Sequence, residues 1–304
     1  YKKRGMMLAD DQILRVMDAL TANGAMAMVH AENGLAIDYL TDKLLAGPPV
    51  GNDAHIKIHR DLLEAEAMFR AVALAEAASC PLFIPHVAVK EGVEAIRPLK
   101  ESLPIPVFLE TCPQYLVLTN EEVLRRGPLA KVGPPIRERH DNDALWDGLR
   151  DGAVDVIGSD HAAIKSEKKM QCNNILDARY GAPVIEYLLT MTYSEGVRKG
   201  RISLERLVQV LCENPAKIFG LYPRKGAIEP GADADVVVFD PEARQLCSAE
   251  TTHSRSGYCV FEGMETVGAP TLVMQRGKVL VENGTLLGKP GEGKYLPRVN
   301  PVWK

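Results

Sequence analysis

Three short apolar runs are each followed by a side chain of a type that binds divalent metals. The runs and the side chains after them are 25–29 with His30, 81–85 with His86, and 154–157 with Asp160. Each run has the length and composition of a buried strand. The carboxyl ends of parallel strands meet at one rim, so we expect the two imidazoles and the carboxylate to converge. Neutral imidazoles with a carboxylate are ligands that suit Zn²⁺ or a similar ion.

A metal held at this rim suggests hydrolytic chemistry. It would lower the pKa of a bound water toward about 7 and so supply a hydroxide at neutral pH. Asp160 would then both bind the metal and act as the general base that takes the proton. We interpret His161, the next residue, as a support behind the ligands or as part of the loop. Cys112 also follows a strand-like run, but no base is arranged for it, which favours a packed thiol.

The other histidines and a lysine-rich stretch are interpreted as surface features. His55 and His59 alternate with isoleucines in a polar stretch flanked by Gly and Pro, so we predict that both are solvated. His140 and His253 have no partner nearby in the sequence and are predicted to lie on the surface. The stretch 165–169 predicts a mobile, solvated loop.

Strand-like and helix-like segments alternate along the first part of the chain. The predicted strands are 25–29, 81–85, 106–109 and 154–157, and the predicted helices are 12–20, 35–45, 62–78, 91–102, 141–151 and 204–220. This alternation requires a parallel sheet with right-handed crossovers. Four such units make half of a (β/α)₈ barrel, which takes roughly 250 residues when complete. We therefore expect the earlier strands to lie upstream of Tyr1, where the sequence begins without a methionine.

The pattern changes after Gly220. The segments 226–240 and 271–284 are β segments punctuated by turns, and the second predicts a hairpin with Arg276-Gly277 at its turn. The predicted organisation is three consecutive parts. These are the C-terminal half of a TIM barrel over 1–222, part of a small β-sandwich domain over 223–288, and a C-terminal tail over 289–304.

Composition excludes several partner classes. The net charge of -4 gives no reason to expect nucleic acid or an anionic membrane as a partner. No apolar run approaches the roughly 20 residues that span a bilayer. The six cysteines show no CxxC spacing, so neither a zinc knuckle nor a disulfide framework is indicated and we expect a reducing, cytoplasmic location.

A set of motifs distributed over nearly the whole chain points to one family. They are Val29-His-Ala-Glu-Asn-Gly34, Glu110-Thr-Cys-Pro-Gln-Tyr-Leu116, Gly158-Ser-Asp-His161, Tyr193-Ser-Glu-Gly-Val-Arg198, Gly200-Arg-Ile-Ser-Leu204, Asn214-Pro-Ala-Lys217 with Phe219-Gly220, and Gly231-Ala-Asp-Ala-Asp-Val-Val236. Together they resemble the dihydropyrimidinase and hydantoinase branch of the amidohydrolase superfamily. The resemblance implies a metal-dependent hydrolase built on an α/β TIM barrel with a small β-sandwich domain, and hydrolysis of a cyclic amide or imide ring.

The resemblance also implies roles for individual residues. His30 and His86 would bind the second of two divalent metals, usually zinc with manganese as the alternative, and Asp160 would bind the first and act as general base. A carboxylated lysine that bridges the metals is expected upstream of Tyr1. Tyr1 itself is placed like the family tyrosine that contacts the substrate and stabilises the oxyanion. Enzymes of the family that this chain resembles are usually homotetramers, which implies the same assembly here.

The chain departs from the family pattern at several positions. The family's first-strand His-x-His pair and its bridging lysine have no counterpart in it. Gly133 stands in Gly-Pro-Pro-Ile-Arg where the family usually has serine, a residue whose contact to the substrate ring runs largely through the backbone. Tyr180 stands where a ring-contacting asparagine is common, and Ala162-Ala163 replace Cys-Pro. We expect Gly133 and Tyr180 to contact the substrate.

Two alternatives stay open at this point. A non-catalytic dihydropyrimidinase-related scaffold protein would share the fold, although such proteins lose metal ligands and His30, His86 and Asp160 are all present. An allantoinase or dihydroorotase type of cyclic amidase is the other alternative. The Ala-Glu-Asn-Gly and Glu-Thr-Cys-Pro-Gln-Tyr stretches fit dihydropyrimidinase better.

Overall fold

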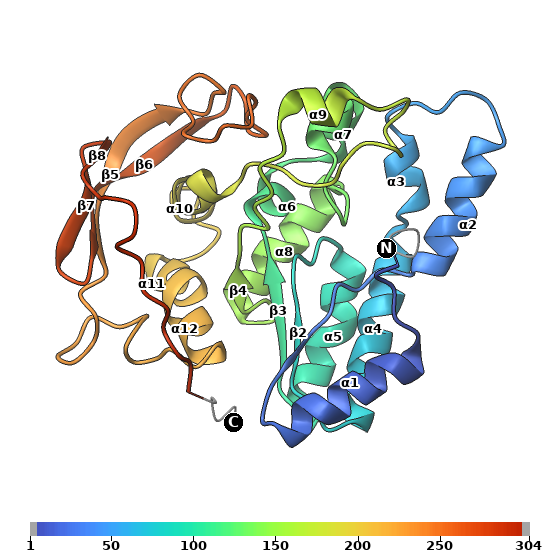
Figure 1. Ribbon diagram of the computed structural model, residues 1–304, viewed down its shortest axis with the longest axis horizontal. Coiled ribbons are helices and arrows are strands. Elements are labelled where there is room, and N and C mark those ends of the chain that lie inside the picture. Colours follow the sequence, from blue (N-terminus) through green and yellow to red (C-terminus); the bar gives the residue numbers. More distant parts are fainter. Residues whose placement is uncertain (1–4, 300–304) are drawn as a thin grey trace.

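The computed structural model describes residues 5–299 and contains two separate sheets (Figure 1). The strands are β1 (Ala27–Met28), β2 (Leu82–Ile84), β3 (Val107–Thr111), β4 (Val156–Ile157), β5 (Val236–Leu246), β6 (Glu265–Gln275), β7 (Lys278–Glu282) and β8 (Thr285–Leu286). The α-helices are α1 (Asp10–Ala22), α2 (Gly34–Leu45), α3 (Ala54–Ile58), α4 (Asp61–Ala77), α5 (Lys90–Ser102), α6 (Pro113–Val117), α7 (Asn120–Arg126), α8 (Arg139–Asp151), α9 (Ser166–Met170), α10 (Leu188–Thr192), α11 (Leu204–Val208) and α12 (Asn214–Ile218).

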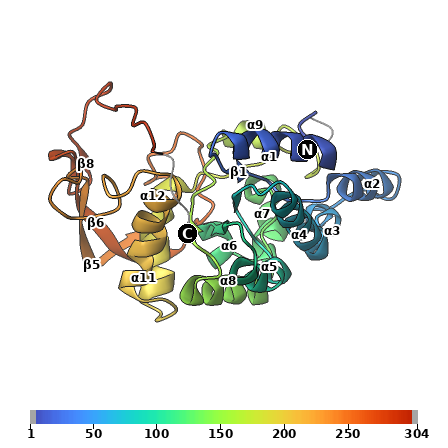
Figure 2. The same ribbon diagram turned by 90° about the horizontal axis from the view of Figure 1, so that it is seen from below.

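The first sheet is parallel, with its strands in the order β1-β2-β3-β4. Because neighbouring parallel strands need crossover connections, the segments between them carry helices that return the chain to the same edge. Helices α4, α5 and α8 pack side by side along one face of the sheet (Figures 1 and 2). The predicted alternation of strand and helix is therefore confirmed.

Strand residues alternate between the two faces of this sheet. Leu82 and Ile84 are fully buried in the main core among the helices. Phe83, which pairs with Phe108 of β3, lies in a second apolar cluster with Val156 and Ile218 of α12. The central strands are thus apolar on both faces, as buried parallel strands are.

The second sheet is antiparallel, with its strands in the order β5-β6-β7-β8, and it stands apart from the first (Figure 1). The predicted hairpin is confirmed: Arg276 and Gly277 connect β6 to β7 with φ values of 48° and 78°. A two-residue turn with both φ values positive matches the right-handed twist of the strands. A parallel βα layer with a separate antiparallel sheet is the fold class that the sequence predicted.

The predicted helix over 204–220 is confirmed as a continuous helical segment formed by α11, a π-helical stretch over 209–213, and α12. His140 and His253 lie at the surface as predicted, with side chains 50% and 82% exposed, and Cys112 is buried. Within residues 5–299, none of the helices combines the length and apolarity needed to cross a membrane.

The prediction of a solvated loop over 165–169 is wrong for Lys169. This lysine closes α9 and is fully buried, and its Nζ donates to the carbonyl oxygens of Lys131, at 3.0 Å, and Gly181. A buried ammonium is tolerated where carbonyl oxygens accept its protons. Burial and the nearby Lys131 lower the pKa of Lys169 to about 7. Its function in the fold is to join two loops that are distant in the sequence.

Candidate active site

His30 and His86 meet at the carboxyl edge of the parallel sheet. The Nδ1 atom of His30 lies 3.0 Å from the Nε2 atom of His86, with the two rings edge to face. On its other side, His30 Nε2 donates to the Oε2 atom of Glu32 at 2.9 Å. Burial, followed by the charge of His30, lowers the pKa of His86 to about 3, so its imidazole is neutral. A neutral ring, as at His86, and a carboxylate on the second ring nitrogen, as at His30, are each features of metal-binding histidines.

Two of the three predicted ligands have an unusual backbone conformation. His86 and Asp160 adopt φ values of 47° and 43°, in the left-handed region that residues with a side chain rarely occupy. The other non-glycine residues with positive φ in the described part of the chain are Ser79, Arg276 and Asn283. Backbone strain of this kind concentrates at functional sites, where the surrounding structure enforces it. It supports a functional role for both strand ends.

Asp160 lies at the mouth of the site near a second carboxylate, that of Glu110 at the end of β3. Glu110 packs directly on Gly158, where an added Cβ would come within 2.3 Å of the Glu110 Oε1 atom. Burial and the charge of Asp160 raise the pKa of Glu110 to about 7. Partial burial also raises the pKa of Asp160 to about 6, against the opposing effect of the nearby His30. Asp160 itself remains open to solvent.

The distance between the histidine rings is that of a hydrogen bond and is also compatible with two ligands of one metal. Two nitrogens bound to one tetrahedral zinc lie roughly 3.3 Å apart, because each Zn–N bond is about 2.0–2.1 Å. The observed 3.0 Å between Nδ1 of His30 and Nε2 of His86 is close to that separation. The described residues contain no cluster of three His, Cys, Asp or Glu side chains placed to hold a metal, so Asp160 does not share a single ligand set with the two histidines. Tyr1 lies outside the described residues.

The prediction that His55 and His59 are solvated is wrong. Their exposed fractions are 0% and 2%, because the short helix α3 packs beneath two loops of the site. His55 Nε2 donates to the carbonyl oxygen of Val132 at 2.8 Å, next to the predicted substrate residue Gly133. His59 Nδ1 donates to the Oε1 atom of Glu32 at 2.6 Å. The polar, Gly/Pro-flanked sequence gave no sign of this burial, since its partners come from elsewhere in the chain.

The second predicted substrate residue, Tyr180, contacts the same helix. Its hydroxyl lies 3.2 Å from His59 Nε2, and the Lys131 ammonium sits over its ring at 4.2 Å from the centroid. The structure therefore brings the loops of Gly133 and Tyr180 together through His55, His59 and Lys131.

His161, predicted to support the ligands or to belong to the loop, is hydrogen-bonded to the loop that follows Tyr180. Its Nδ1 atom accepts from the backbone N–H groups of Val184 and Ile185, both at 3.1 Å. An isolated parallel bridge also joins His161 to Ala182. This side chain therefore fixes the loop that follows Tyr180 rather than the histidine pair.

A buried ion pair supports the helix that carries this network. Arg137 Nη2 donates to the Oε2 atom of Glu64 at 2.6 Å, and the Ala88 N–H donates to the other carboxylate oxygen at 2.8 Å. Arg137 also bonds the His59 carbonyl oxygen and pairs with Asp61. Burial raises the pKa of Glu64 to about 7, whereas the neighbouring carboxylates raise the pKa of Arg137 and keep it charged.

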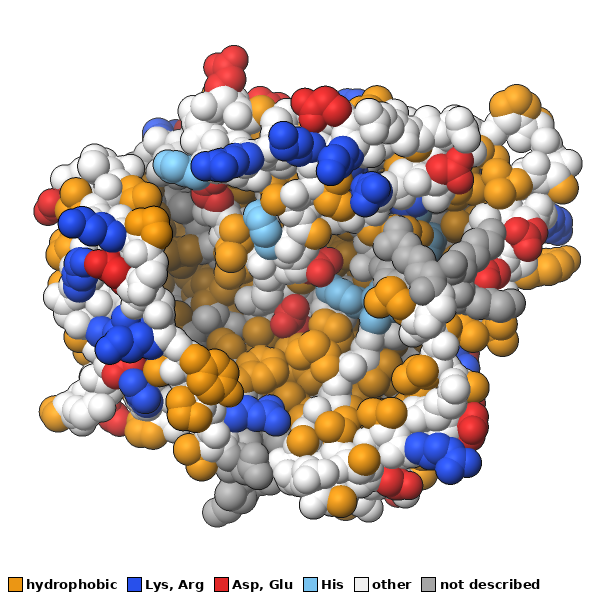
Figure 3. Space-filling model, in the orientation of Figure 1, with side chains coloured by type: hydrophobic (Ala, Val, Ile, Leu, Met, Phe, Trp, Pro, Cys, Tyr) orange, Lys and Arg blue, Asp and Glu red, His pale blue; other side chains and the backbone are white. Residues whose placement is uncertain are grey.

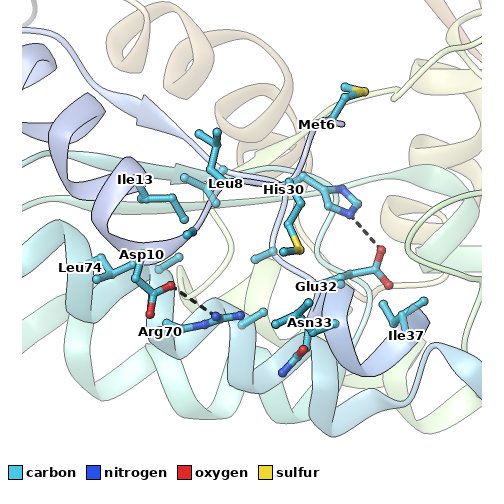
Figure 4. Close-up of a pocket in the computed structure, with 18 of the residues that line it drawn as sticks. Met6, Leu8, Asp10, Ile13, His30, Glu32, Asn33, Ile37, Arg70 and Leu74 are labelled. Carbon is cyan, nitrogen blue, oxygen red and sulfur yellow. Dashed lines mark hydrogen bonds and ion pairs between the residues drawn. The ribbon is translucent and has the colours of Figure 1, made fainter. Parts of the chain in front are cut away.

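A pocket of about 750 Å³ adjoins the histidine pair. His30, Glu32, His59 and Tyr180 contribute polar groups on the side of the histidine pair. Most of the remaining lining is apolar, including Met6, Leu8, Ile13 and Ile37, and the Asp10–Arg70 ion pair lies at another wall (Figure 4). The space-filling view shows a hollow in this face of the molecule with hydrophobic side chains across its floor (Figure 3). A largely apolar cavity with a few convergent polar groups is the usual form of a small-molecule site.

Sequence reasoning missed Glu32, His55, His59 and the Glu64–Arg137 pair. The only signal for Glu32 was its position two residues after His30, on the same strand end. Extended backbone places residues i and i+2 on one side, which makes a carboxylate at that spacing a natural partner of the histidine. The other four are recognisable only from contacts across the fold.

Comparisons with known proteins agree with this geometry. The model of the amidohydrolase family matches residues 3–280. The chain is 40% identical over 301 residues to a D-hydantoinase of Ralstonia pickettii, covering 97% of this chain and 65% of that protein. It is 37% identical over 294 residues to an L-hydantoinase of Paenarthrobacter aurescens, covering 96% and 64% respectively. The chain thus spans about 65% of the length of the relatives that it matches.

Solved structures show the same likeness. A crystal structure of D-hydantoinase superposes with a TM-score of 0.94 at 38% identity, over 97% of this chain and 65% of that one. The dihydropyrimidinase from Brevibacillus agri NCHU1002 superposes with a TM-score of 0.95 at 36% identity, over 98% and 66%. The expected fold and resemblance are confirmed, and the chain belongs to the amidohydrolase family.

Proposed function

We propose that the protein to which this chain belongs is a metal-dependent cyclic amidohydrolase of the dihydropyrimidinase and hydantoinase type. The observation that carries the proposal is the histidine pair. The facing nitrogens of His30 and His86 are 3.0 Å apart, and Glu32 orients the His30 ring. Relatives named D-hydantoinase, L-hydantoinase and dihydropyrimidinase support a cyclic amide or imide as the substrate.

Each site residue takes a distinct part in this proposal. His30, His86 and Asp160 would hold a binuclear centre of Zn²⁺ or Mn²⁺ together with a carboxylated lysine. Bound divalent ions would supply a nucleophile at neutral pH by acidifying water. Asp160 accepts the proton of the attacking water as general base. Tyr1 would stabilise the oxyanion.

The substrate ring would lie in the pocket between the histidine pair and Tyr180. Tyr1, Tyr180 and the backbone at Gly133 would contact it, and His161 would hold the loop after Tyr180. The apolar walls exclude water and leave the few polar groups to set the orientation of the ring.

We expect the full-length protein, with added zinc or manganese, to open dihydrouracil or 5-substituted hydantoins. Ring opening is detected as a loss of ultraviolet absorbance and by chromatography of the open-chain product. Metal removal by a chelator should abolish turnover, and restored metal should return it. Failure to hydrolyse any ring in the panel would overturn the proposal and favour a non-catalytic relative with this fold.

We also propose that the protein assembles as a homotetramer, as expected from its resemblance. A closed homo-oligomer would present the same surface patches on each subunit. Sedimentation velocity of the full-length protein at micromolar concentration should give a single species of four subunits. A monomer under these conditions would contradict the proposal.

A further inference from the structure

Glu110 lies between the two strand ends that carry His86 and Asp160. It belongs to β3, which pairs with β2 on one side and with β4 on the other. His86 follows β2, and Asp160 follows β4. Because side chains alternate along a strand, Glu110 shares a face of the sheet with Phe108, which packs in the second apolar cluster. A single side chain on the middle strand can therefore contact both neighbouring strand ends.

Glu110 accepts hydrogen bonds from two successive backbone groups at the end of β2. The Val87 N–H donates to the Glu110 carbonyl oxygen at 2.7 Å, and the backbone N–H of His86 donates to the Glu110 side chain. Next to it, the Thr111 hydroxyl donates to the Val87 carbonyl oxygen at 2.8 Å. His86 has a φ of 47°, a conformation that persists only where the surrounding structure enforces it. These bonds supply that support.

The same side chain occupies the space over Gly158, two residues before Asp160. A Cβ added at Gly158 would come within 2.3 Å of Oε1 and 2.4 Å of Cδ of Glu110. Gly158 is not among the glycines with positive φ, so its backbone conformation does not require glycine. The contact with Glu110 is what requires it. A larger residue at position 158 would push the Glu110 carboxyl group away from the His86 N–H.

We propose that Glu110 is a positioning residue that sets the spacing between the His86 and Asp160 strand ends. Its side chain binds the His86 backbone on one side and packs on Gly158 on the other. A carboxyl group accepts a hydrogen bond in either protonation state, so this role depends on its shape and its oxygen atoms rather than on its charge. The inference rests on the proposed function, since that proposal makes His86 and Asp160 metal ligands.

The first test compares Glu110→Ala with Glu110→Gln in the full-length protein. Zinc affinity is measured by competition with a chromogenic chelator, and turnover is measured with hydantoin and dihydrouracil. In Glu110→Ala, we expect zinc affinity to fall roughly 10- to 100-fold, as for other residues that orient metal ligands. The value of kcat should fall with little change in KM, because Glu110 acts through the ligands. Glu110→Gln keeps the shape and an acceptor oxygen, so it should stay close to the wild type. Equal losses in both variants would overturn the inference.

The second test approaches the same contact from Gly158. Gly158→Ala should reproduce the loss of zinc affinity, because the new methyl group displaces the Glu110 carboxyl group. The double variant Glu110→Ala with Gly158→Ala should lose no more than Glu110→Ala alone, since the methyl group then enters vacated space. Additive losses would contradict the inference. Gly47→Ala is the matched control, because its added Cβ would meet only the Leu44 carbonyl oxygen at 3.4 Å, and it should leave zinc affinity unchanged.

Crystal structures of the wild type and of Glu110→Ala separate this inference from the proposed function. We expect the positive φ of His86, of Asp160 or of both to be lost in Glu110→Ala, while circular dichroism shows that the variant is folded. If both φ values and the zinc affinity are unchanged, the inference fails and the proposed function stands. If the wild type opens no ring but the strand ends move in Glu110→Ala, the proposed function fails and the positioning role of Glu110 stands.

Discussion

Asp160→Asn should reduce turnover of the full-length enzyme by about 10² to 10⁴, the usual loss when general-base help is removed. The substitution keeps the shape of the side chain and the proposed ligand oxygen, but it removes the proposed general base and one negative charge. Weaker metal binding adds to the loss. Turnover and metal content should both be measured, in the full-length protein and with saturating zinc or manganese.

His161→Asn is the comparison for this prediction. The His161 ring accepts from the N–H groups of Val184 and Ile185, in the loop that follows Tyr180, so metal content should be unchanged. We expect a smaller loss of roughly 10- to 100-fold, as is common for residues that orient others. Near-normal turnover of Asp160→Asn with full metal occupancy would show that this strand end is not the catalytic centre.

Arg137→Met should destabilise the fold by about 3–5 kcal/mol, because it leaves the buried Glu64 carboxylate without its cation. Both side chains are only 2% exposed, and Arg137 also donates to the carbonyl oxygen of His59, at the end of α3. The measurement is the free energy of unfolding from urea titration, with metal present. A cost below about 1 kcal/mol would contradict the assignment of a desolvated ion pair.

The penalty for Arg137→Met should depend on pH in a defined direction. The pKa of Glu64 is about 7 in the folded wild type, above its usual value, and loss of Arg137 raises it further. A carboxyl group whose pKa is higher in the folded than in the unfolded protein contributes stability that is fully present at low pH. That stability is lost as pH rises through the folded pKa. The penalty should therefore be larger at pH 8.5 than at pH 6. In the double variant Glu64→Gln with Arg137→Met, this pH dependence should disappear because no carboxylate remains to titrate.

Local sequence determined the parallel layer and the strand ends of the candidate site. Short apolar runs, helices with acidic first turns, and glycines after helices are local signals, since each reflects contacts within a few residues. The same signals placed His30, His86 and Asp160 at strand ends, and the parallel register then brought the two histidines together. The hairpin at Arg276-Gly277 followed for the same reason, because a two-residue turn is set by its own residues.

Tertiary structure alone decided which polar side chains are buried. His59 and Tyr180 are 121 positions apart in the sequence, and Arg137 is 73 positions from Glu64. In isolation, a histidine or lysine in a polar stretch is best solvated, because burial without partners costs several kcal/mol. His55, His59 and Lys169 are buried because carbonyl and carboxylate oxygens from other parts of the chain accept their protons. These partners exist only once the sheet has brought the loops together, so no local pattern can encode them.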